Sequence, residues 1–131
     1  MHSGGFTKKS AMWYDLAVRA QKDGQALSAE VCVPSGSPWF DGHFPGAPVL
    51  PGIAQLGMVF DLIRHAFEGP VRVTEVSRVR FKQIILPEDR LVVAAEPRPG
   101  KTGTYAFRIT KGEELVCSGT MVVEAAAPAQ I

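Results

Sequence analysis

The chain has 131 residues, of which 46% are apolar and 21% are charged, and its formal net charge is +1. This length and composition are typical of one globular domain, and the balanced charge gives no reason to expect binding to nucleic acid. No apolar stretch approaches the roughly 20 residues that a membrane-spanning helix needs.

The two ends of the chain are expected to lie outside the folded part. Residues 1–10 lack the apolar run of a secretory signal, so we expect a disordered leader there and a cytoplasmic protein. One domain is expected over residues 11–125, followed by a flexible tail over 126–131. Cys32 and Cys117 lie in apolar, strand-like segments, so buried reduced thiols are expected, and two cysteines alone cannot form a zinc site.

The first regular elements predicted are a strand and a long helix. An alternating segment from Leu27 to Val33 predicts the strand. After Pro51, apolar residues recur at steps of three and four until Gly69-Pro70, which would stop the helix. These apolar positions are Ile53, Leu56, Val59, Phe60, Ile63 and Phe67. A helix of about 17 residues with so broad an apolar face is expected to be enclosed by other elements.

The rest of the chain carries strand signals. Strands are predicted over 71–85, 90–96, 104–110 and 114–124, with a turn at Leu86-Pro87-Glu88-Asp89 and a hairpin about Lys111-Gly112. One central helix followed by several antiparallel strands predicts an α+β fold in which the sheet wraps around the helix.

A glycine- and proline-rich loop from Trp39 to Gly52 precedes the helix and contains His43. Three prolines follow this histidine within eight residues. Prolines fix φ and glycines permit conformations closed to other residues, and such constraint is most often found at functional sites. A rigid turn that only packs is the alternative reading. His2, in the leader, and His65, on the polar stripe of the helix, are expected to be solvated or structural.

The start of the predicted helix supplies a second part of a site. The N–H groups of Gly52 and Ile53 would have no acceptors inside the helix, and the helix dipole adds partial positive charge there. A thioester or ester carbonyl placed at this point would be polarised, which acidifies its α-carbon. Gly52 allows a ligand to approach closely, and His43 is suited to removing the α-proton. The loop therefore predicts chemistry on a carbonyl compound.

This loop resembles the signature of the β-hydroxyacyl-[acyl-carrier-protein] dehydratases, through the residues Gly42-His43-Phe44-Pro45-Gly46-Ala47-Pro48-Val49-Leu50-Pro51-Gly52. These are hotdog-fold enzymes of fatty-acid synthesis and related pathways. The segment from Val79 to Leu91 is similar to the family's strand–Pro–acid–Asp–strand segment. Pro38-Trp39-Phe40 and Gly52-Ile53-Ala54-Gln55-Leu56 look most like the shorter branch that includes the dehydratases of aryl-polyene clusters.

The resemblance implies a hydro-lyase that reversibly removes water from a 3-hydroxyacyl thioester to give a 2-enoyl thioester, without a metal or cofactor. By the same resemblance, His43 would be catalytic and the Val49 carbonyl would orient its ring. The Gly52 N–H would bind the thioester oxygen, and Phe44 and Ile53 would contact the substrate. An acyl carrier protein is the implied partner, and a homodimer or an oligomer of dimers is the implied assembly.

One residue of the family pattern is absent. The pattern places Glu or Asp on the helix fourteen residues after the histidine, and here that position is Gly57. Asp61 follows one turn later, about 6 Å away by helical rise, and could replace the acid directly or through a water. Pairing with Arg64 in a polar stripe is the alternative explanation for Asp61. Gln55 is expected to position the substrate, and Gly57 suggests close packing or room for a ligand.

Two further expectations concern partners and function. Arg78, Arg80 and Lys82 alternate along a predicted strand, with Lys101 and Arg108 as candidates for the same surface. This basic face predicts a docking surface for an acidic carrier protein, or an ordinary solvated strand face. Two other functions stay open, namely thioester hydrolysis, with a helix carboxylate to activate water, and non-catalytic binding of an acyl chain or carrier protein.

Overall fold

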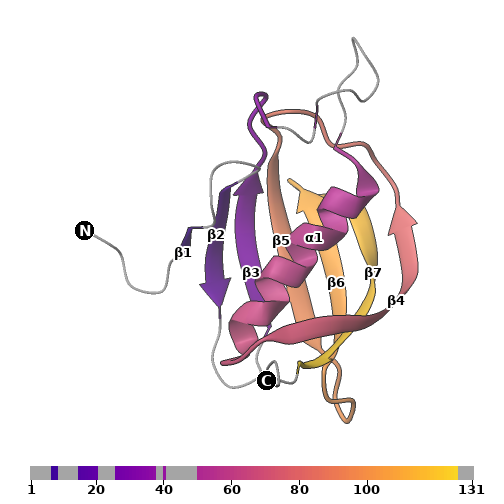
Figure 1. Cartoon of the computed structure of the whole chain (residues 1–131). Coiled ribbons are helices and arrows are strands. Elements are labelled where there is room, and N and C mark those ends of the chain that lie inside the picture. Colours follow the sequence, from indigo (N-terminus) through magenta and orange to yellow (C-terminus); the bar gives the residue numbers. More distant parts are fainter. Residues whose placement is uncertain (1–6, 9–14, 21–25, 38–39, 41–49, 127–131) are drawn as a thin grey trace.

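The computed structural model of the protein describes residues 7–8, 15–20, 26–37, 40 and 50–126 (Figure 1). In chain order the elements are β1 (Thr7–Lys8), β2 (Asp15–Ala20), β3 (Leu27–Cys32), α1 (Gly52–Ile63), η2 (Arg64–Ala66), β4 (Val71–Phe81), β5 (Arg90–Pro97), β6 (Thr104–Lys111) and β7 (Glu114–Ala125). β1 falls inside the stretch 1–10 for which a leader is predicted. The rest of that stretch and residues 127–131 lie outside the described residues.

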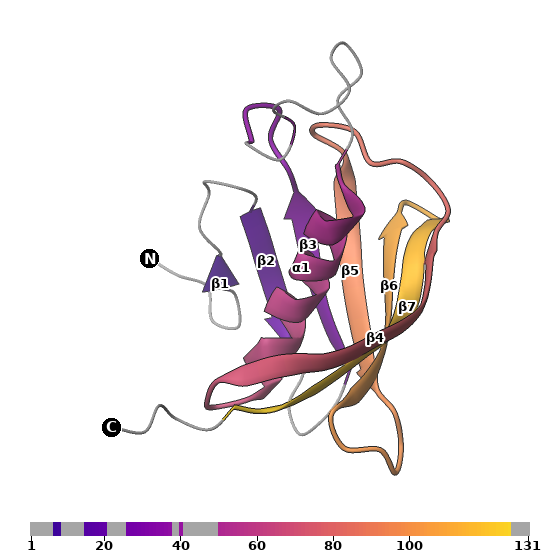
Figure 2. The same ribbon diagram turned by 45° about the vertical axis from the view of Figure 1, so that its right-hand side comes forward.

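The described strands form one antiparallel seven-stranded sheet in the order β1-β2-β3-β5-β6-β7-β4. Its middle is regular: Ala106 in β6 lies opposite Glu96 in β5 on one side and Thr120 in β7 on the other. The sheet curves, and α1 lies against its concave face, as the two views of the ribbon show (Figures 1 and 2). The predicted α+β plan, an antiparallel sheet wrapped around a central helix, is confirmed.

The helix is shorter than predicted. α1 begins directly after Pro51, but its regular part has 12 residues and ends at Ile63, where η2 tightens into a 3-10 turn. The chain is extended at Phe67 (φ −121°, ψ 146°). Gly69 and Pro70 come two and three residues later, and Pro70 cannot continue a helix. No helix among the described residues is long and apolar enough to cross a membrane.

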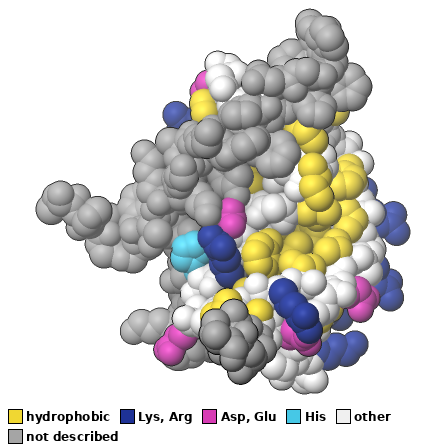
Figure 3. Space-filling view, in the orientation of Figure 1, with side chains coloured by type: hydrophobic (Ala, Val, Ile, Leu, Met, Phe, Trp, Pro, Cys, Tyr) yellow, Lys and Arg dark blue, Asp and Glu magenta, His cyan; other side chains and the backbone are white. Residues whose placement is uncertain are grey.

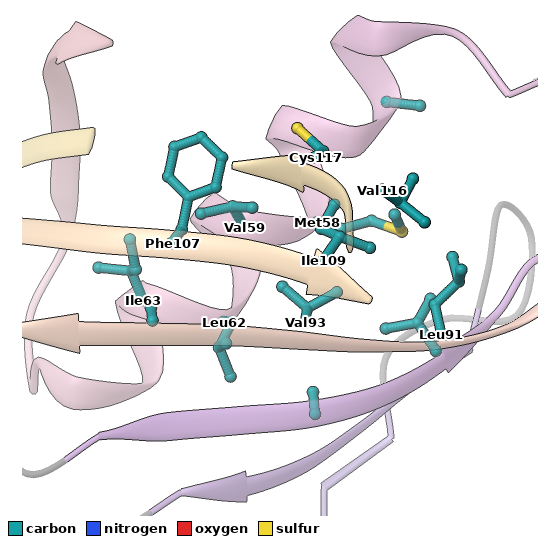
Figure 4. Packing of buried hydrophobic residues seen from close by; sticks show 14 of the residues in the cluster. Met58, Val59, Leu62, Ile63, Leu91, Val93, Phe107, Ile109, Val116 and Cys117 are labelled. Atoms are coloured by element: carbon teal, nitrogen blue, oxygen red, sulfur yellow. The ribbon is translucent and has the colours of Figure 1, made fainter. Parts of the chain in front are cut away.

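The face of α1 that contacts the sheet also differs from the predicted one. Its buried residues are Ala54, Gln55, Met58, Val59, Leu62 and Ile63. Figure 4 shows this face against inward-pointing side chains of β5 and β6, such as Val93 and Ile109. Ile53, which the periodicity places on the apolar face, is 69% exposed. Of the α1 residues, Ile53 and Gly57 are exposed, so the described residues do not enclose the helix completely.

Strand β4 differs from the central strands. β5 and β6 alternate between buried and exposed side chains, as expected for a sheet with one face on a core. No residue of β4 is fully buried, and its pairing with β7 shifts register between Ser77 and Arg80. Arg78, within this irregularity, has a φ of 58°. The regular alternation predicted for the basic residues of this strand is therefore interrupted.

The end of β4 was also predicted too late in the chain. The strand stops at Phe81 rather than at Ile85. Beyond it, the N–H groups of Lys82 and Gln83 both donate to the Val116 carbonyl, at 2.7 and 3.4 Å. Two donors converge on one acceptor, which interrupts the regular ladder, and residues 82–89 form a connector to β5.

Both cysteines are free thiols. Cys117 is fully buried, and this burial raises the pKa of its thiol to about 11. Cys32, at the end of β3, is half-buried. The Cys117 thiol is therefore neutral near pH 7 and packs as a small apolar side chain.

Candidate active site

The predicted site residues divide into two groups. Gly52, Ile53, Gln55, Gly57 and Asp61 all lie on α1 and are described. The predictions for His43, Phe44 and Val49 fall in residues 41–49, which lie outside the described residues. The described half of the candidate site is therefore the helix together with the elements that contact its N-terminal end.

The N-terminus of α1 has no side-chain cap. Pro51 precedes it in an extended conformation (φ −64°, ψ 153°), and no acidic residue lies in the first turn. The Pro51 carbonyl accepts the N–H groups of Ala54 and Gln55, at 3.1 and 3.3 Å. The N–H groups of Gly52 and Ile53 come before these and have no acceptor within the helix. These two donors and the helix dipole together favour an electron-rich group at this end.

Phe81, the last residue of β4, lies against this helix N-terminus. A Cβ atom added to Gly52 would be 2.8 Å from Cζ of the Phe81 ring. Glycine thus allows the end of β4 to approach the first turn of the helix. The ring is 51% exposed, so it forms an apolar wall beside the Gly52 N–H rather than a closed cover.

Gln55 has a polar atom without a partner. Its side chain is 3% exposed, and its Nε2 donates to the Leu50 carbonyl at 3.4 Å. Its Oε1 is buried and accepts no hydrogen bond from the described residues. Leaving a buried acceptor unpaired costs about 1–3 kcal/mol. In the first turn of α1, Oε1 of Gln55 is therefore a buried acceptor that can take a hydrogen bond.

Gly57 lies beside open space. No atom of the described chain would lie within 4 Å of a Cβ added there, and the residue is exposed. Packing inside the single chain therefore does not require glycine at this position, contrary to one of the two expectations from the sequence. Glycine at this position is then explained by room for a ligand or for a second chain.

Asp61 makes the local interactions that a polar stripe predicts. Its carboxylate lies 3.6 Å from Nε of Arg64, and its side chain is 13% exposed. Nδ1 of His65 lies 2.8 Å from the Asp61 carbonyl oxygen, and the Arg64 guanidinium lies over the Phe60 ring, 5.9 Å from its centroid. Asp61 and Gly57 are one turn apart on α1, as predicted.

Apolar side chains are exposed around the first turns of α1 and along β4. Figure 3 shows apolar side chains gathered between these elements on the face of Figure 1. The large exposed apolar residues outside β5 are Ile53, Val73, Val76, Phe81, Ile84 and Leu86. We call these six residues the apolar surface. Such a surface on a small domain usually marks an interaction or ligand site.

The basic residues predicted to share a face are placed differently. Arg78 and Arg108 line one cavity of about 330 Å³, together with Arg98, the acidic Glu96, Ser118 and Thr120. Arg98 was not among the predicted residues, whereas Arg80, Lys82 and Lys101 do not line this cavity. Arg78 of β4 and Arg108 of β6 line the same cavity although β7 lies between these two strands, which strand alternation alone does not predict.

The chain is similar to several proteins of known structure or name. It shares the fold of a dehydratase heterocomplex, ApeI:P, from Xenorhabdus doucetiae, with a TM-score of 0.69, 21% identity, and coverage of 79% of this chain and 90% of that one. It also shares the fold of a mutant of the fluoroacetyl-CoA-specific thioesterase FlK, with a TM-score of 0.60, 18% identity, and coverage of 79% and 88%. Fold similarity at this level is found in both dehydratases and thioesterases.

Sequence similarity is more specific. The 3-hydroxyacyl-[acyl-carrier-protein] dehydratase FabZ of Syntrophomonas wolfei is 36% identical over 91 residues, which are 63% of this chain and 63% of that protein. The chain thus spans somewhat less than two thirds of that relative's length. The model of the ApeI-like family, described as ApeI dehydratase, matches residues 19–120, well over half of the chain. The chain therefore belongs to the ApeI-like dehydratase family.

Proposed function

We propose that this protein catalyses the reversible removal of water from a 3-hydroxyacyl thioester carried by an acyl carrier protein. Family membership supports the reaction class, and the FabZ relative is named for this activity. The observation that carries the proposal is the N-terminus of α1, where Gly52 and Ile53 present N–H groups that have no acceptor in the helix. A thioester oxygen bound there would gain the charge stabilisation that an enolate-like transition state needs.

In this proposal His43 removes a proton from C2, and the hydroxyl on C3 leaves with a proton as water. The Gly52 N–H binds the thioester oxygen, and the Val49 carbonyl orients the His43 ring. Phe44 and Ile53 contact the acyl group. The close approach of Phe81 to Gly52 supports an apolar wall on one side of the bound thioester.

The proton for the leaving hydroxyl needs a donor, because Gly57 carries no carboxylate. We assign this role to Asp61, one turn further along α1, acting through a water. Its ion pair with Arg64 is the competing explanation for the residue. Gln55 is assigned the positioning of the hydroxyl or of that water, since its buried Oε1 can accept one more hydrogen bond.

The direct test is turnover of a 3-hydroxyacyl-carrier-protein substrate, followed by mass spectrometry as the loss of one water. The wild-type protein should equilibrate the hydroxyacyl and enoyl forms. His43→Ala should lower the rate by roughly 10²–10⁴-fold, the range of general acid–base catalysis. Absence of turnover on both carrier-protein and coenzyme A thioesters would refute the proposal, and release of free thiol would instead identify a thioesterase.

A second copy of the chain is proposed to cover the free edge of the sheet. β4 pairs only with β7 among the described strands, and it exposes Val73, Val76 and Phe81. A long, partly apolar edge strand favours pairing with another chain. Because the similar ApeI:P structure is a heterocomplex, a different subunit of the same fold is the alternative occupant.

Light scattering over a range of concentrations tests this assembly. The wild-type protein should have the mass of a dimer, and Val76→Lys should shift it toward the monomer. Val92→Lys is the matched control, because Val92 is similarly exposed, at 42% against 38% for Val76, but lies on a central strand. A monomeric wild-type protein that dimerises only with a second hotdog chain would favour the heterocomplex.

The cavity lined by Arg78, Arg98 and Arg108 is proposed to contact the carrier protein, because these three cations outnumber the one acidic residue of its lining, Glu96. Acyl carrier proteins are acidic, and cationic clusters accelerate association with acidic partners in a salt-dependent way. Arg108→Glu should raise KM for the carrier-protein substrate and leave turnover of a small synthetic thioester unchanged. Equal effects on both substrates would assign Arg108 to the fold rather than to docking.

One structural feature favours a second candidate function. Open space beside Gly57, with no carboxylate in it, also suits a protein that binds an acyl chain or carrier protein without chemistry. This function predicts tight binding of an acyl-carrier protein, no turnover, and the same affinity in His43→Ala as in the wild type.

A further inference from the structure

The connector between β4 and β5, residues 82–89, contacts both ends of the segment that contains His43. On the N-terminal side, the Glu88 N–H donates to the Val33 carbonyl at 2.9 Å. The Glu88 carboxylate also accepts the Ser35 N–H through Oε2 at 2.8 Å. On the C-terminal side, the Leu50 N–H donates to the Ile85 carbonyl at 2.8 Å. One short connector therefore holds the chain just before residue 38 and just after residue 49.

Glu88 makes these contacts from a strained backbone conformation. Its φ is 70°, in the left-handed region that residues with a side chain rarely adopt. Such strain persists only where the surroundings hold it, and it is concentrated at functional sites. Here the backbone and the side chain of Glu88 are both engaged, and Cys32 Sγ also lies 3.9 Å from Oε1. Glycine would adopt this φ without strain but would lose the carboxylate.

The connector is itself braced against the sheet. Oδ2 of Asp89 accepts the Leu86 N–H at 2.9 Å and lies 3.3 Å from Nζ of Lys111 at the end of β6. The Asp89 N–H donates back to the Leu86 carbonyl at 3.2 Å. Ile85 is fully buried in the core. Glu88 thus lies in a connector that is held in place by contacts with β6 and with the core.

The chain between the two anchors is also folded on itself at its start. The Ser37 N–H donates to the Pro34 carbonyl at 2.9 Å, and the Phe40 N–H donates to the Ser37 carbonyl at 3.0 Å. Ser37 is 1% exposed and Phe40 is 7% exposed. A shift at Ser35 would therefore disturb these two hydrogen bonds and the buried side chains of Ser37 and Phe40.

We propose that Glu88 is a positioning residue, whose carboxylate fixes the Ser35 backbone and thereby the placement of the His43 segment relative to the N-terminus of α1. This inference rests on the proposed function for the role of His43. Sequence reasoning assigned Glu88 only to a turn; its position between a proline and an aspartate in the dehydratase-like segment was the available signal. A misplacement of about 1 Å can cost about 10²-fold in rate, so a single anchoring hydrogen bond is sufficient to matter.

Three variants separate anchoring from strain. Glu88→Ala removes the carboxylate but leaves the backbone strain. Glu88→Gly removes the carboxylate and also relieves the strain. Glu88→Gln keeps a neutral acceptor of the same length. Glu113→Ala is the control, since Glu113 is an exposed acidic residue in the β6–β7 turn. We expect kcat to fall by roughly 10- to 100-fold in both the Ala and the Gly variants, with partial recovery in Glu88→Gln and none of this loss in Glu113→Ala.

Hydrogen exchange of the peptide spanning residues 34–50 provides a readout that does not depend on activity. Exchange there should become faster in the Ala and Gly variants, while the melting temperature of Glu88→Gly stays at or above that of Glu88→Ala. A kcat within twofold of wild type, or unchanged exchange in this peptide, overturns the proposal. If the wild-type protein shows no dehydration, the proposed function fails by itself, and the exchange measurement still decides whether Glu88 anchors the segment.

Discussion

The two ends of α1 use their polar groups in opposite ways. At the C-terminal end, Asp61 pairs with Arg64, and the His65 ring contacts the Asp61 carbonyl. At the N-terminal end, Pro51 provides no side-chain cap, and the buried Oε1 of Gln55 accepts nothing from the described residues. Stability by itself is enough to explain groups that are satisfied within the helix, so a catalytic role for Asp61 needs a separate test. Groups that the described residues leave unsatisfied can bind a ligand, so the difference favours the N-terminal end for the proposed chemistry.

The largest expected effect tests whether Asp61 only stabilises the C-terminal end of α1 or also takes part in the reaction. Asp61→Asn and Arg64→Gln both remove the same ion pair, but only the first removes a group that can transfer a proton. If Asp61 is the acid, Asp61→Asn should lower kcat by roughly 10²-fold or more, whereas Arg64→Gln should stay near wild type. Steady-state kinetics of the two variants decides this, and equal rates would leave Asp61 a structural residue.

The next effect concerns Gln55. Gln55→Met keeps the volume and removes both the unpaired acceptor and the long 3.4 Å hydrogen bond to the Leu50 carbonyl, so we expect a free energy of unfolding close to that of wild type. Activity should nevertheless fall by about 10-fold, because the hydroxyl or water loses a positioning group. Chemical denaturation and kinetics on one preparation measure both. A destabilised variant with unchanged kcat would make Gln55 an ordinary core residue.

Substitution of Gly57 should have a smaller effect, and it should stabilise the protein. Because nothing in the described chain lies within 4 Å of an added Cβ, Gly57→Ala should raise the free energy of unfolding by about 0.5–1 kcal/mol through helix propensity alone. Thermal denaturation at fixed protein concentration measures this gain. A loss of stability instead would mean that a second chain or an uncharacterised group packs against this position.

The smallest effect is expected for the ion pair itself. The Arg64 side chain is 45% exposed and lies one helical turn after Asp61, so Arg64→Gln should lower the free energy of unfolding by only about 0.2–0.5 kcal/mol. The loss should shrink further in high salt, because exposed charges are screened. A loss well above 1 kcal/mol would show that Arg64 stabilises the C-terminal end of α1 more than its contacts indicate.

Local patterns predicted most of the architecture. Alternation located β3 and the strands after α1, the pair Lys111-Gly112 located the β6–β7 hairpin, and Pro51 located the start of the helix. The errors have a common origin. Ile53 was placed on a buried face because period alone does not say which side of an apolar helix meets the sheet. The end of β4 was misplaced because two N–H groups converge on the Val116 carbonyl, a contact between distant residues.

For the candidate site, the sequence by itself determined the residue types: a histidine in a glycine- and proline-rich segment, glycine at the first helical position, and glycine where a carboxylate is expected. These follow from local chemistry, since proline and glycine restrict or release the backbone wherever they occur. Only the tertiary structure decided that Phe81 lies on Gly52, that Gln55 keeps an unpaired oxygen, and that Glu88 reaches Ser35. Each of these joins groups whose mutual position is set by how the sheet curves around α1, and no local pattern encodes that curvature.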